Sequence, residues 1–405
     1  MDRKMEKFLR EIPKTDLHVH LDGSLRLSTL IELAKKENVQ LPSYEEAGLN
    51  ELVFKENYAN LGEYLKGFSY TCAVMQKEEN LERIAYELAL DNINENVRYL
   101  EVRFAPQLHI NRKLTLSQII GAVSKGLEKA RKEHSQNERV KTGEDIPFKY
   151  GVIVCAMRCF NEYFSSYYHD LIKTLNFAPR KEIFKIASME LARAAIKMKN
   201  EHGYPIVGFD LAGEEAGYPP IYQKEAYDYV HKNFMGKTVH AGEAYGAESI
   251  FQAITECHAN RIGHGTSLFD HEEIKDTDII NPEQFSDELA NYIASRRISI
   301  EVCPTSNLQT IPELKNDIKN HPVKKMIDKR LSVSICTDNR LVSHTNVIKE
   351  LSLIVENFSI TPKQLRDIII AGFKGSFYYS NYVNHRKFVR LAIDQYDKLA
   401  KELLD

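Results

Sequence analysis

Polar and apolar side chains alternate in the segment TDLHVHLDGSLR, residues 15–26. Because successive side chains of an extended strand point to opposite faces, His18, His20 and Asp22 share one face and the apolar residues between them share the other. Imidazole nitrogens and carboxylate oxygens are common ligands of divalent transition metals. The segment therefore predicts a strand that aims two candidate metal ligands and a further carboxylate into one place.

Three later segments place more donors of the same kind directly after an apolar run. His240 lies in HAGE, His264 in GHG and Asp338 in TDN. Together with the two histidines of the first strand they form a set of nitrogen and oxygen donors without a thiolate. Such a set suits a divalent ion, zinc above all, with one position left open for water.

A metal ion bound in this way would supply hydrolytic chemistry, because it lowers the pKa of bound water from about 15.7 to about 7. Glu243 follows His240 by three residues, in the turn beyond the strand, where it would face a substrate while His240 faces the metal. A carboxylic acid held near apolar walls can have a raised pKa and donate a proton. We therefore expect Glu243 to be the proton donor.

Eight short apolar runs, each ending in a polar cluster, account for the elements that must position these residues. The runs lie at 16–20, 99–106, 149–158, 205–213, 237–243, 261–266, 298–307 and 331–339. Segments with helical periodicity lie between them, which predicts an α/β fold of the (β/α)8 TIM-barrel type with its site at the carboxyl ends of the strands. The competing doubly wound sheet would carry a glycine-rich phosphate turn after an early strand, and the first strand carries H-x-H-x-D instead.

No linker rich in Pro, Gly and Ser divides the chain, so we expect a single domain over 1–405. Its barrel core is predicted at about 14–345, with extra surface helices at about 362–405. Two charged segments, 129–147 and 269–289, are predicted to be long surface connections between barrel elements.

Composition excludes several classes of partner. The net charge of -3 and the interspersed charged residues favour neither nucleic acid nor an anionic membrane as a partner. No apolar stretch approaches the length of a membrane span, and the charged first residues do not resemble a secretory signal. Six cysteines lie scattered without the spacing of a disulfide framework. We expect a cytoplasmic protein that acts on a small molecule.

Six motifs, in order along residues 14–343, carry a resemblance to a known family. TDLHVHLDGSL, DLAGEE, HAGE, RIGHGT, CPTSN and TDN resemble the adenosine deaminase family of the metal-dependent amidohydrolases. The resemblance implies one Zn²⁺ per chain, held by His18, His20, His240 and Asp338. It also implies hydrolytic deamination of adenosine, and of 2'-deoxyadenosine, to inosine and ammonia in purine salvage.

The same resemblance implies roles for individual residues. The implied catalytic residues are Glu243, which protonates purine N1, His264, which acts as a base or orients the attacking water, and Asp338, which accepts a hydrogen bond from that water. The implied substrate contacts are His20 beside the metal, Asp22 at the ribose 5'-hydroxyl, the backbone N–H of Gly213 at purine N3, and Asn339 at purine N7.

Asn339 departs from the commonest family pattern, in which a second aspartate and a proline follow the zinc-binding aspartate. Here Asn339 and Arg340 follow Asp338. Purine N7 is an acceptor, so an aspartate needs a proton to bond to it, whereas an asparagine donates through its amide. We expect the N7 contact to be retained and to lose one source of pH dependence.

Three alternatives stay open at this stage. A related aminopurine deaminase would act on adenine, a 5'-modified adenosine or AMP, although Asp22 suits a hydroxyl and repels a phosphate. A barrel hydrolase with two metals would need a bridging ligand such as Asp210, which lies early in its strand, so a mononuclear site is favoured. A binding protein without catalysis would explain none of the retained donors.

Overall fold

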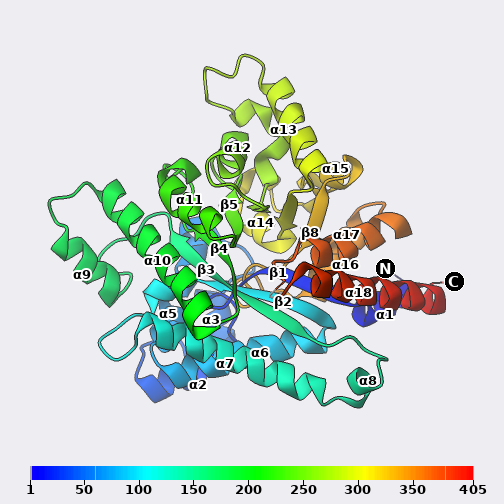
Figure 1. The fold of residues 1–405 in the computed structure, drawn as a ribbon, viewed down its shortest axis with the longest axis horizontal. Helices are drawn as coiled ribbons and strands as arrows, with labels where there is room; N and C mark the ends of the chain where they lie inside the picture. The colour runs from blue at the N-terminus through cyan, green and yellow to red at the C-terminus, as the bar shows by residue number, and fades with distance from the viewer. Residues whose placement is uncertain (1, 60, 379, 405) are drawn as a thin grey trace.

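The computed structural model describes residues 2–59, 61–378 and 380–404, and eight parallel strands form its centre (Figure 1). The strands are β1 Lys14–His20, β2 Val97–Phe104, β3 Lys149–Met157, β4 Ile206–Ala212, β5 Gly236–Ala241, β6 Arg261–His264, β7 Ser299–Val302 and β8 Ser332–Ile335. They neighbour one another in sequence order, and each overlaps one of the eight predicted apolar runs. The predicted (β/α)8 barrel is confirmed.

The barrel closes where β1 meets the residues just after β8. The backbone N–H of His20 donates to the carbonyl of Asp338 over 2.7 Å, and the N–H of Asp338 donates to the carbonyl of His18 over 2.7 Å. The same two hydrogen bonds place a predicted metal-binding aspartate directly beside the two histidines of the first strand.

Helices surround the strands and connect them (Figure 1). In the first half of the chain they are α1 Arg3–Glu11, α2 Leu27–Glu37, α3 Glu46–Leu52, α4 Leu61–Leu65, α5 Gly67–Val74, α6 Glu78–Asn94, α7 Leu116–Ser135, α8 Glu138–Lys141, α9 Ser166–Thr174 and α10 Arg180–His202. In the second half they are α11 Lys224–Lys232, α12 Ala247–Thr255, α13 Pro282–Arg296, α14 Pro304–Thr310, α15 Val323–Asp328, α16 Val347–Asn357, α17 Pro362–Gly375 and α18 Tyr382–Leu403.

The two predicted surface connections are partly wrong. The first, 129–147, begins inside α7, because the buried face that includes Val123, Leu127 and Ala130 continues into the charged segment and keeps it helical. The second, 269–289, ends inside α13, which starts at Pro282 with the side chain of Asn281 as its N-cap. The prediction of connections rested on charge alone, and a surface helix also carries charged residues on its outer face.

The C-terminal helices cover the amino-terminal end of the barrel. Helix α17 lies against β1 and β8, so closely that a Cβ on Gly372 would lie 2.1 Å from the Thr15 hydroxyl. The Phe377 ring lies 3.7 Å from the Arg261 guanidinium at the start of β6. Helix α18 runs beside α1, and the two chain ends lie close together (Figure 1).

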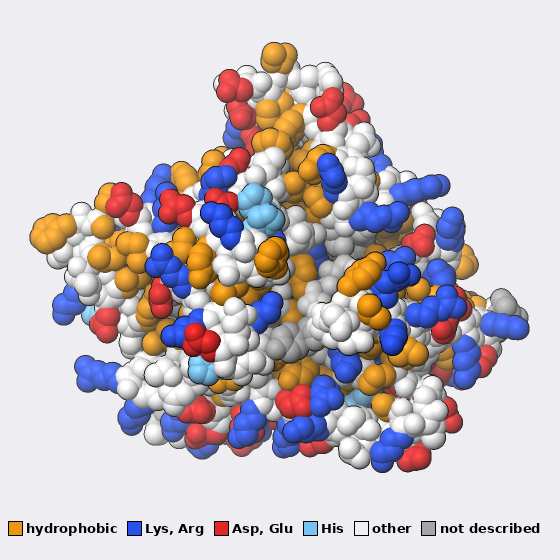
Figure 2. All heavy atoms as spheres, in the orientation of Figure 1, with side chains coloured by type: hydrophobic (Ala, Val, Ile, Leu, Met, Phe, Trp, Pro, Cys, Tyr) orange, Lys and Arg blue, Asp and Glu red, His pale blue; other side chains and the backbone are white. Residues whose placement is uncertain are grey.

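The outer surface carries both signs of charge. Figure 2 shows basic and acidic side chains interspersed over the visible face, in agreement with the expectation from composition. No helix within the described residues is long and apolar enough to cross a membrane.

Candidate metal centre and active site

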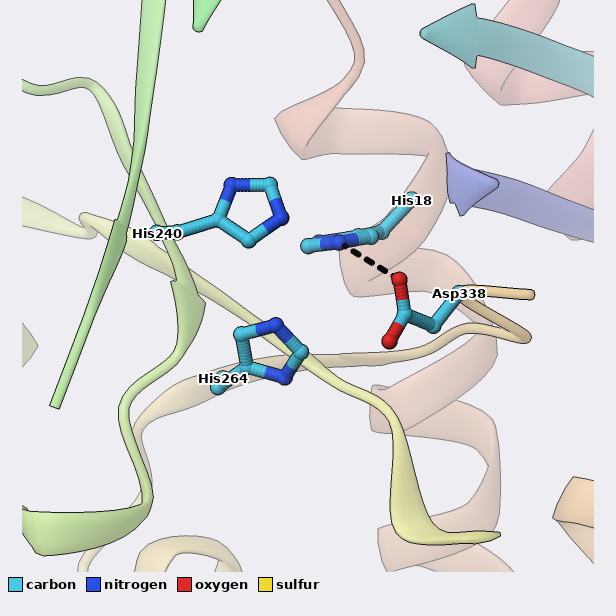
Figure 3. Close-up of side chains that lie close together, drawn as sticks. All are labelled: His18, His240, His264 and Asp338. Carbon is cyan, nitrogen blue, oxygen red and sulfur yellow. Dashed lines mark ion pairs between the residues drawn. The ribbon is translucent and has the colours of Figure 1, made fainter. Parts of the chain in front are cut away.

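Four side chains from different strand ends converge at the carboxyl end of the barrel (Figure 3). One donor atom from each of His18, His240, His264 and Asp338 lies within 4.8 Å of the others. His20 belongs to the same group, because its Nε2 lies 3.2 Å from Nε2 of His240 and 3.4 Å from Oδ1 of Asp338. All five donors predicted from the sequence are therefore brought together.

The backbone at two of these donors is in the left-handed region, which non-glycine residues adopt uncommonly. His264 has φ 65° and Asp338 has φ 59°. Positions of this kind cost free energy and persist where the surrounding structure holds them. At Asp338 the two backbone hydrogen bonds to β1 hold the turn, so the carboxylate points towards His18 and His20.

The Nδ1 contacts of two histidines define which nitrogen faces the cluster. His18 Nδ1 lies 2.9 Å from a carboxylate oxygen of Glu301, and His240 Nδ1 lies 3.1 Å from a carboxylate oxygen of Asp210. A carboxylate only accepts, so each Nδ1 carries the hydrogen and each Nε2 presents a lone pair, as metal-binding histidines do. Among the described residues His18 Nε2 is buried without a hydrogen-bond partner, so its lone pair fits a metal ligand.

Burial also keeps the imidazole of His20 neutral. His20 is buried against the other histidines, and burial lowers its pKa well below the usual range. A neutral imidazole is the form that binds a metal. His20 is therefore available as a third imidazole ligand at this place.

A layer of buried charges supports the donors from below. Arg103 donates to Asp210 over 2.9 Å and to Glu301 over 2.7 Å, while Arg261 donates to Glu301 over 2.5 Å and also pairs with Glu101. Burial alone would raise the pKa of Glu301, but the two guanidinium groups hold it well below its usual range.

The charges of this layer and of Asp338 do not cancel. Three buried carboxylates, those of Glu101, Asp210 and Glu301, pair with the two guanidinium groups, and the buried carboxylate of Asp338 lies beside His18 and His20. The two excess negative charges are what a divalent cation would balance, because buried charge is costly unless it is paired. The donor set and its charge both fit a divalent metal ion.

Asp210 has a different role from the one considered in the sequence. It holds Arg103 and His240 through its two oxygens and does not extend to the donor cluster as a bridge between two metals. Sequence reasoning missed Glu301 and Arg103 altogether. A signal was present, because each is a charged residue within a run that the sequence predicts to be a buried strand.

Glu243 projects into the same space from the turn after β5. Glu215 organises that turn, since its carboxylate accepts the backbone N–H groups of Gly242, Glu243 and Ala244 over 2.6–2.9 Å. The Glu243 carboxylate accepts a hydrogen bond from the Thr310 hydroxyl over 2.9 Å. Its other oxygen lies 3.8 Å from His264 Nε2, so the predicted proton donor and the predicted orienting histidine are neighbours.

Asn339 packs between the first strand and helix α4. Its Nδ2 lies 2.9 Å from the Tyr64 hydroxyl. Its Oδ1 lies over Gly23, where a Cβ would be only 1.8 Å away, so this close approach requires the glycine of HLDGS. Tyr64, which sequence reasoning missed, also lies 2.9 Å from the Ser343 hydroxyl, and Ser306 donates to Asp338 over 2.5 Å nearby.

A cavity of about 590 Å³ opens over these groups, a size typical of small-molecule sites. The predicted residues that line it are His20, Asp22, Gly213, His240, Glu243, His264, Asp338 and Asn339. Apolar and aromatic side chains, among them Leu65, Phe68 and Phe164, line the rest. None of the described lining residues is a lysine or an arginine.

Asp22 lies deep in the wall of this cavity, where its Oδ1 is 3.9 Å from Nδ1 of His20. Burial, helped by the charge of Asp338, raises its pKa to about 7. Donor atoms of Cys72 and His109 lie within 4.8 Å of its carboxylate. His109 is fully buried, and burial lowers its pKa to about 3, so the imidazole beside Asp22 is neutral.

A closed (β/α)8 barrel whose strand ends gather four imidazoles and a carboxylate around one point defines the class of metal-dependent barrel hydrolases. The family model for adenosine deaminase matches residues 13–387. The chain belongs to the adenosine deaminase family.

Individual relatives agree with the family assignment. An adenosine deaminase from Mycobacterium ulcerans is 35% identical over 371 residues, which cover 91% of each chain. A solved amidohydrolase with bound Zn, from Burkholderia ambifaria, matches with a TM-score of 0.77 at 20% identity, over 100% of this chain and 96% of its own. The N6-mAMP deaminase of Arabidopsis matches with a TM-score of 0.71 at 23% identity, over 96% and 99%. The two structures support the fold.

Proposed function

We propose that the protein catalyses the hydrolytic deamination of adenosine, and of 2'-deoxyadenosine, to inosine and ammonia. The observation that carries the proposal is the convergence of four imidazoles and Asp338 at one point, with Glu243 beside them in a cavity of small-molecule size. Family membership and relatives named adenosine deaminase support the same activity.

We infer that one Zn²⁺ is held by His18, His20, His240 and Asp338. The hydrogen bonds from Nδ1 of His18 to Glu301 and from Nδ1 of His240 to Asp210 support this set, because they direct both Nε2 lone pairs inward. When bound, such an ion polarises a water molecule and lowers its pKa to about 7.

The protein's own groups would then handle the protons and the ring. Glu243 would donate a proton to purine N1 as an oxygen adds at C6, so that the ring does not accumulate negative charge. Asp338 would orient the attacking water and accept one of its protons, and His264 would contact the same oxygen. As the adduct collapses, that proton would leave with the amino group as ammonia, and Glu243 would recover its proton from the new hydroxyl, which leaves inosine.

The walls of the cavity would hold the nucleoside through three contacts. The Asn339 amide would donate to N7, and the backbone N–H of Gly213, which lines the cavity with φ 100°, would donate to N3. Asp22 would accept the 5'-hydroxyl. Because these contacts address different edges of the substrate, together they would set the position of C6 over the metal centre.

The charge of the cavity favours a nucleoside over a nucleotide. Asp22, Glu214, Glu243 and Asp338 line it, and the described lining holds no lysine or arginine to pair with a phosphate. AMP is therefore a poor substrate on electrostatic grounds. Adenine and 5'-thioether nucleosides carry no phosphate and stay alternative substrates within the same reaction.

The test is the loss of absorbance at the adenine band after adenosine is added to purified protein, with and without a chelator. We expect conversion that a chelator abolishes and added zinc restores. The matched control is Glu243→Gln, which keeps the shape of the side chain and should retain zinc while losing turnover. Preference for free adenine over adenosine, or conversion that a chelator leaves unchanged, would contradict the proposal.

A further inference from the structure

We propose that His321 and Asn307 are positioning residues that fix the tautomer of His264, so that its Nε2 carries a hydrogen and faces the cavity. The inference rests on the proposed function for its catalytic meaning, and on hydrogen-bond geometry for the tautomer itself. It chooses between the two roles implied for His264, since a ring with a hydrogen on Nε2 donates there and is not a base.

The chain of hydrogen bonds starts at a backbone group whose direction is certain. The N–H of Val323, the first residue of α15, donates to Nδ1 of His321 over 3.1 Å. The first N–H groups of a helix have no partner within the helix, so this imidazole serves as a cap. A backbone N–H can only donate, and therefore Nδ1 of His321 carries no hydrogen.

His321 is neutral, because it is 3% exposed and burial, with a smaller effect of His264, lowers its pKa to about 3. A neutral ring with a bare Nδ1 has its hydrogen on Nε2. That nitrogen lies 3.2 Å from Oδ1 of Asn307, which must accept. The reversed amide would place an N–H of Asn307 against the N–H of His321, which is repulsive.

The orientation of the Asn307 amide decides which nitrogen of His264 carries the hydrogen. With Oδ1 bound to His321, its Nδ2 faces Nδ1 of His264 over 2.9 Å and donates to it. Nδ1 of His264 is therefore the acceptor, and the hydrogen of the neutral ring lies on Nε2. Asn307 is fully buried on α14, where water cannot substitute for either contact.

The outward nitrogen of His264 lies 3.8 Å from Glu243 and beside the metal donors. An N–H at this position is not a metal ligand, which explains why His20 and not His264 completes the proposed ligand set. It is a donor aimed at the place where negative charge develops on the attacking oxygen. Removing one such donor typically lowers kcat by about 10²- to 10³-fold.

Asn307→Asp replaces the group that donates to Nδ1 of His264 by one that accepts, with almost no change in the shape of the side chain. The carboxylate still accepts from His321, but it also accepts from His264, whose hydrogen must then move to Nδ1. We expect kcat for adenosine to fall about 100-fold with KM changed by less than about threefold, because the lost donor acts on the reacting oxygen. The matched control is Asn320→Asp, which makes the same change one residue before His321. Asn320 takes no part in the hydrogen bonds from Val323 to His264, so this variant should retain activity.

His321→Asn provides a second variant. An asparagine oxygen can still cap Val323, but the shorter side chain does not extend to Asn307, so the Asn307 amide becomes free to reverse. We expect a smaller fall in kcat, about tenfold, with unchanged zinc content, since a free amide retains the productive orientation part of the time.

A direct readout comes from the ring nitrogens of the zinc-loaded protein labelled with ¹⁵N-histidine. Correlation spectra distinguish the two neutral tautomers, and His264→Gln and His321→Gln assign the signals. We expect Nε2–H in both rings of the wild type, and a hydrogen on Nδ1 of His264 in Asn307→Asp. A wild-type His264 that carries its hydrogen on Nδ1 overturns the inference, as does an Asn307→Asp enzyme within twofold of wild-type kcat. A wild type without turnover of adenosine would instead overturn the proposed function. The spectra would still test whether Asn307 and His321 fix the tautomer of His264.

Discussion

Strands β2 and β3 differ from strands β5 to β8 in length and in the part of the cavity that their carboxyl ends supply. β2 and β3 run for 8 and 9 residues, whereas β6, β7 and β8 each have 4. The long strands supply Arg103 to the buried charge layer and, with the residue after β2, apolar side chains such as Ala105 and Met157 to the cavity wall. The short strands end early, and the residues at or beyond their ends carry the chemistry.

Backbone conformation follows the same division. Gly242, His264 and Asp338, at or after the ends of β5, β6 and β8, all have positive φ. In the described segments directly after β2 and β3, residues 105–115 and 158–165, no residue has a positive φ. Tight turns after β5, β6 and β8 orient the reactive groups towards the cavity. The longer strands β2 and β3 supply part of the cavity wall. The turns should therefore be sensitive to substitution and the wall tolerant.

The largest effect is expected at a turn after a short strand. Asp338→Asn keeps the shape of the side chain and tolerates the left-handed backbone, but it removes the charge that balances a divalent ion. We expect kcat to fall by about 10³-fold or more, with loss of bound zinc measured by metal analysis. Circular dichroism provides the control for folding. Full activity in this variant would show that the aspartate is no ligand.

The buried charge layer should have the next largest effect. Glu301→Gln removes a negative charge and replaces one of the two acceptor oxygens by a donor, so it cannot accept from His18 and Arg103 on one side and from Arg261 on the other. We expect zinc affinity to fall by about 10- to 100-fold, which competition with a chelator measures. An unchanged affinity together with lower thermal stability would give Glu301 a structural role only.

Tyr64→Phe tests the contact that holds the Asn339 amide. The ring stays in the cavity wall, but the acceptor of Asn339 Nδ2 is lost. We expect kcat/KM for adenosine to fall by about 3- to 10-fold. The control is Tyr58→Phe, because that neighbouring hydroxyl donates to the backbone of Val342 and does not touch Asn339. Equal losses in both variants would contradict a specific role for Tyr64.

The wall from the long strands should tolerate change. Met157→Leu replaces a residue that lines the cavity at the end of β3 with one of similar volume. We expect kcat/KM to change by less than about threefold, because such swaps preserve packing. A loss as large as that of Glu301→Gln would break the comparison between the two sets of strands.

The smallest effect on activity is expected at Glu350, where substitution should change how the free energy of unfolding depends on pH. This buried carboxyl of α16 accepts from the N–H of Thr305 and the hydroxyl of Thr345, and burial raises its pKa to about 7. The folded state then binds more protons than the unfolded state between pH about 4.5 and 7, so the free energy of unfolding falls as pH rises through this window. Glu350→Gln should remove that slope in denaturant titrations at several pH values. Parallel profiles for the two proteins would mean that Glu350 does not titrate there.

Much of the site could be predicted because strand periodicity is local. The alternation in TDLHVHLDGSLR already places His18 and His20 on one face, and the recurrence of polar clusters after apolar runs predicts the barrel. The segments 129–147 and 269–289 were harder, because a charged sequence does not distinguish a loop from the outer face of a helix.

By itself, the sequence determined the barrel, the five converging donors and the presence of Asn339 where the family has an aspartate, since each depends on residue type and short spacing. Only the tertiary structure decided which nitrogen of each histidine faces the centre. That choice depends on hydrogen-bond partners far along the chain, Glu301 for His18, Asp210 for His240, and His321 through Asn307 for His264. The hydrogen of a neutral imidazole follows its neighbours in space, and no local pattern encodes them.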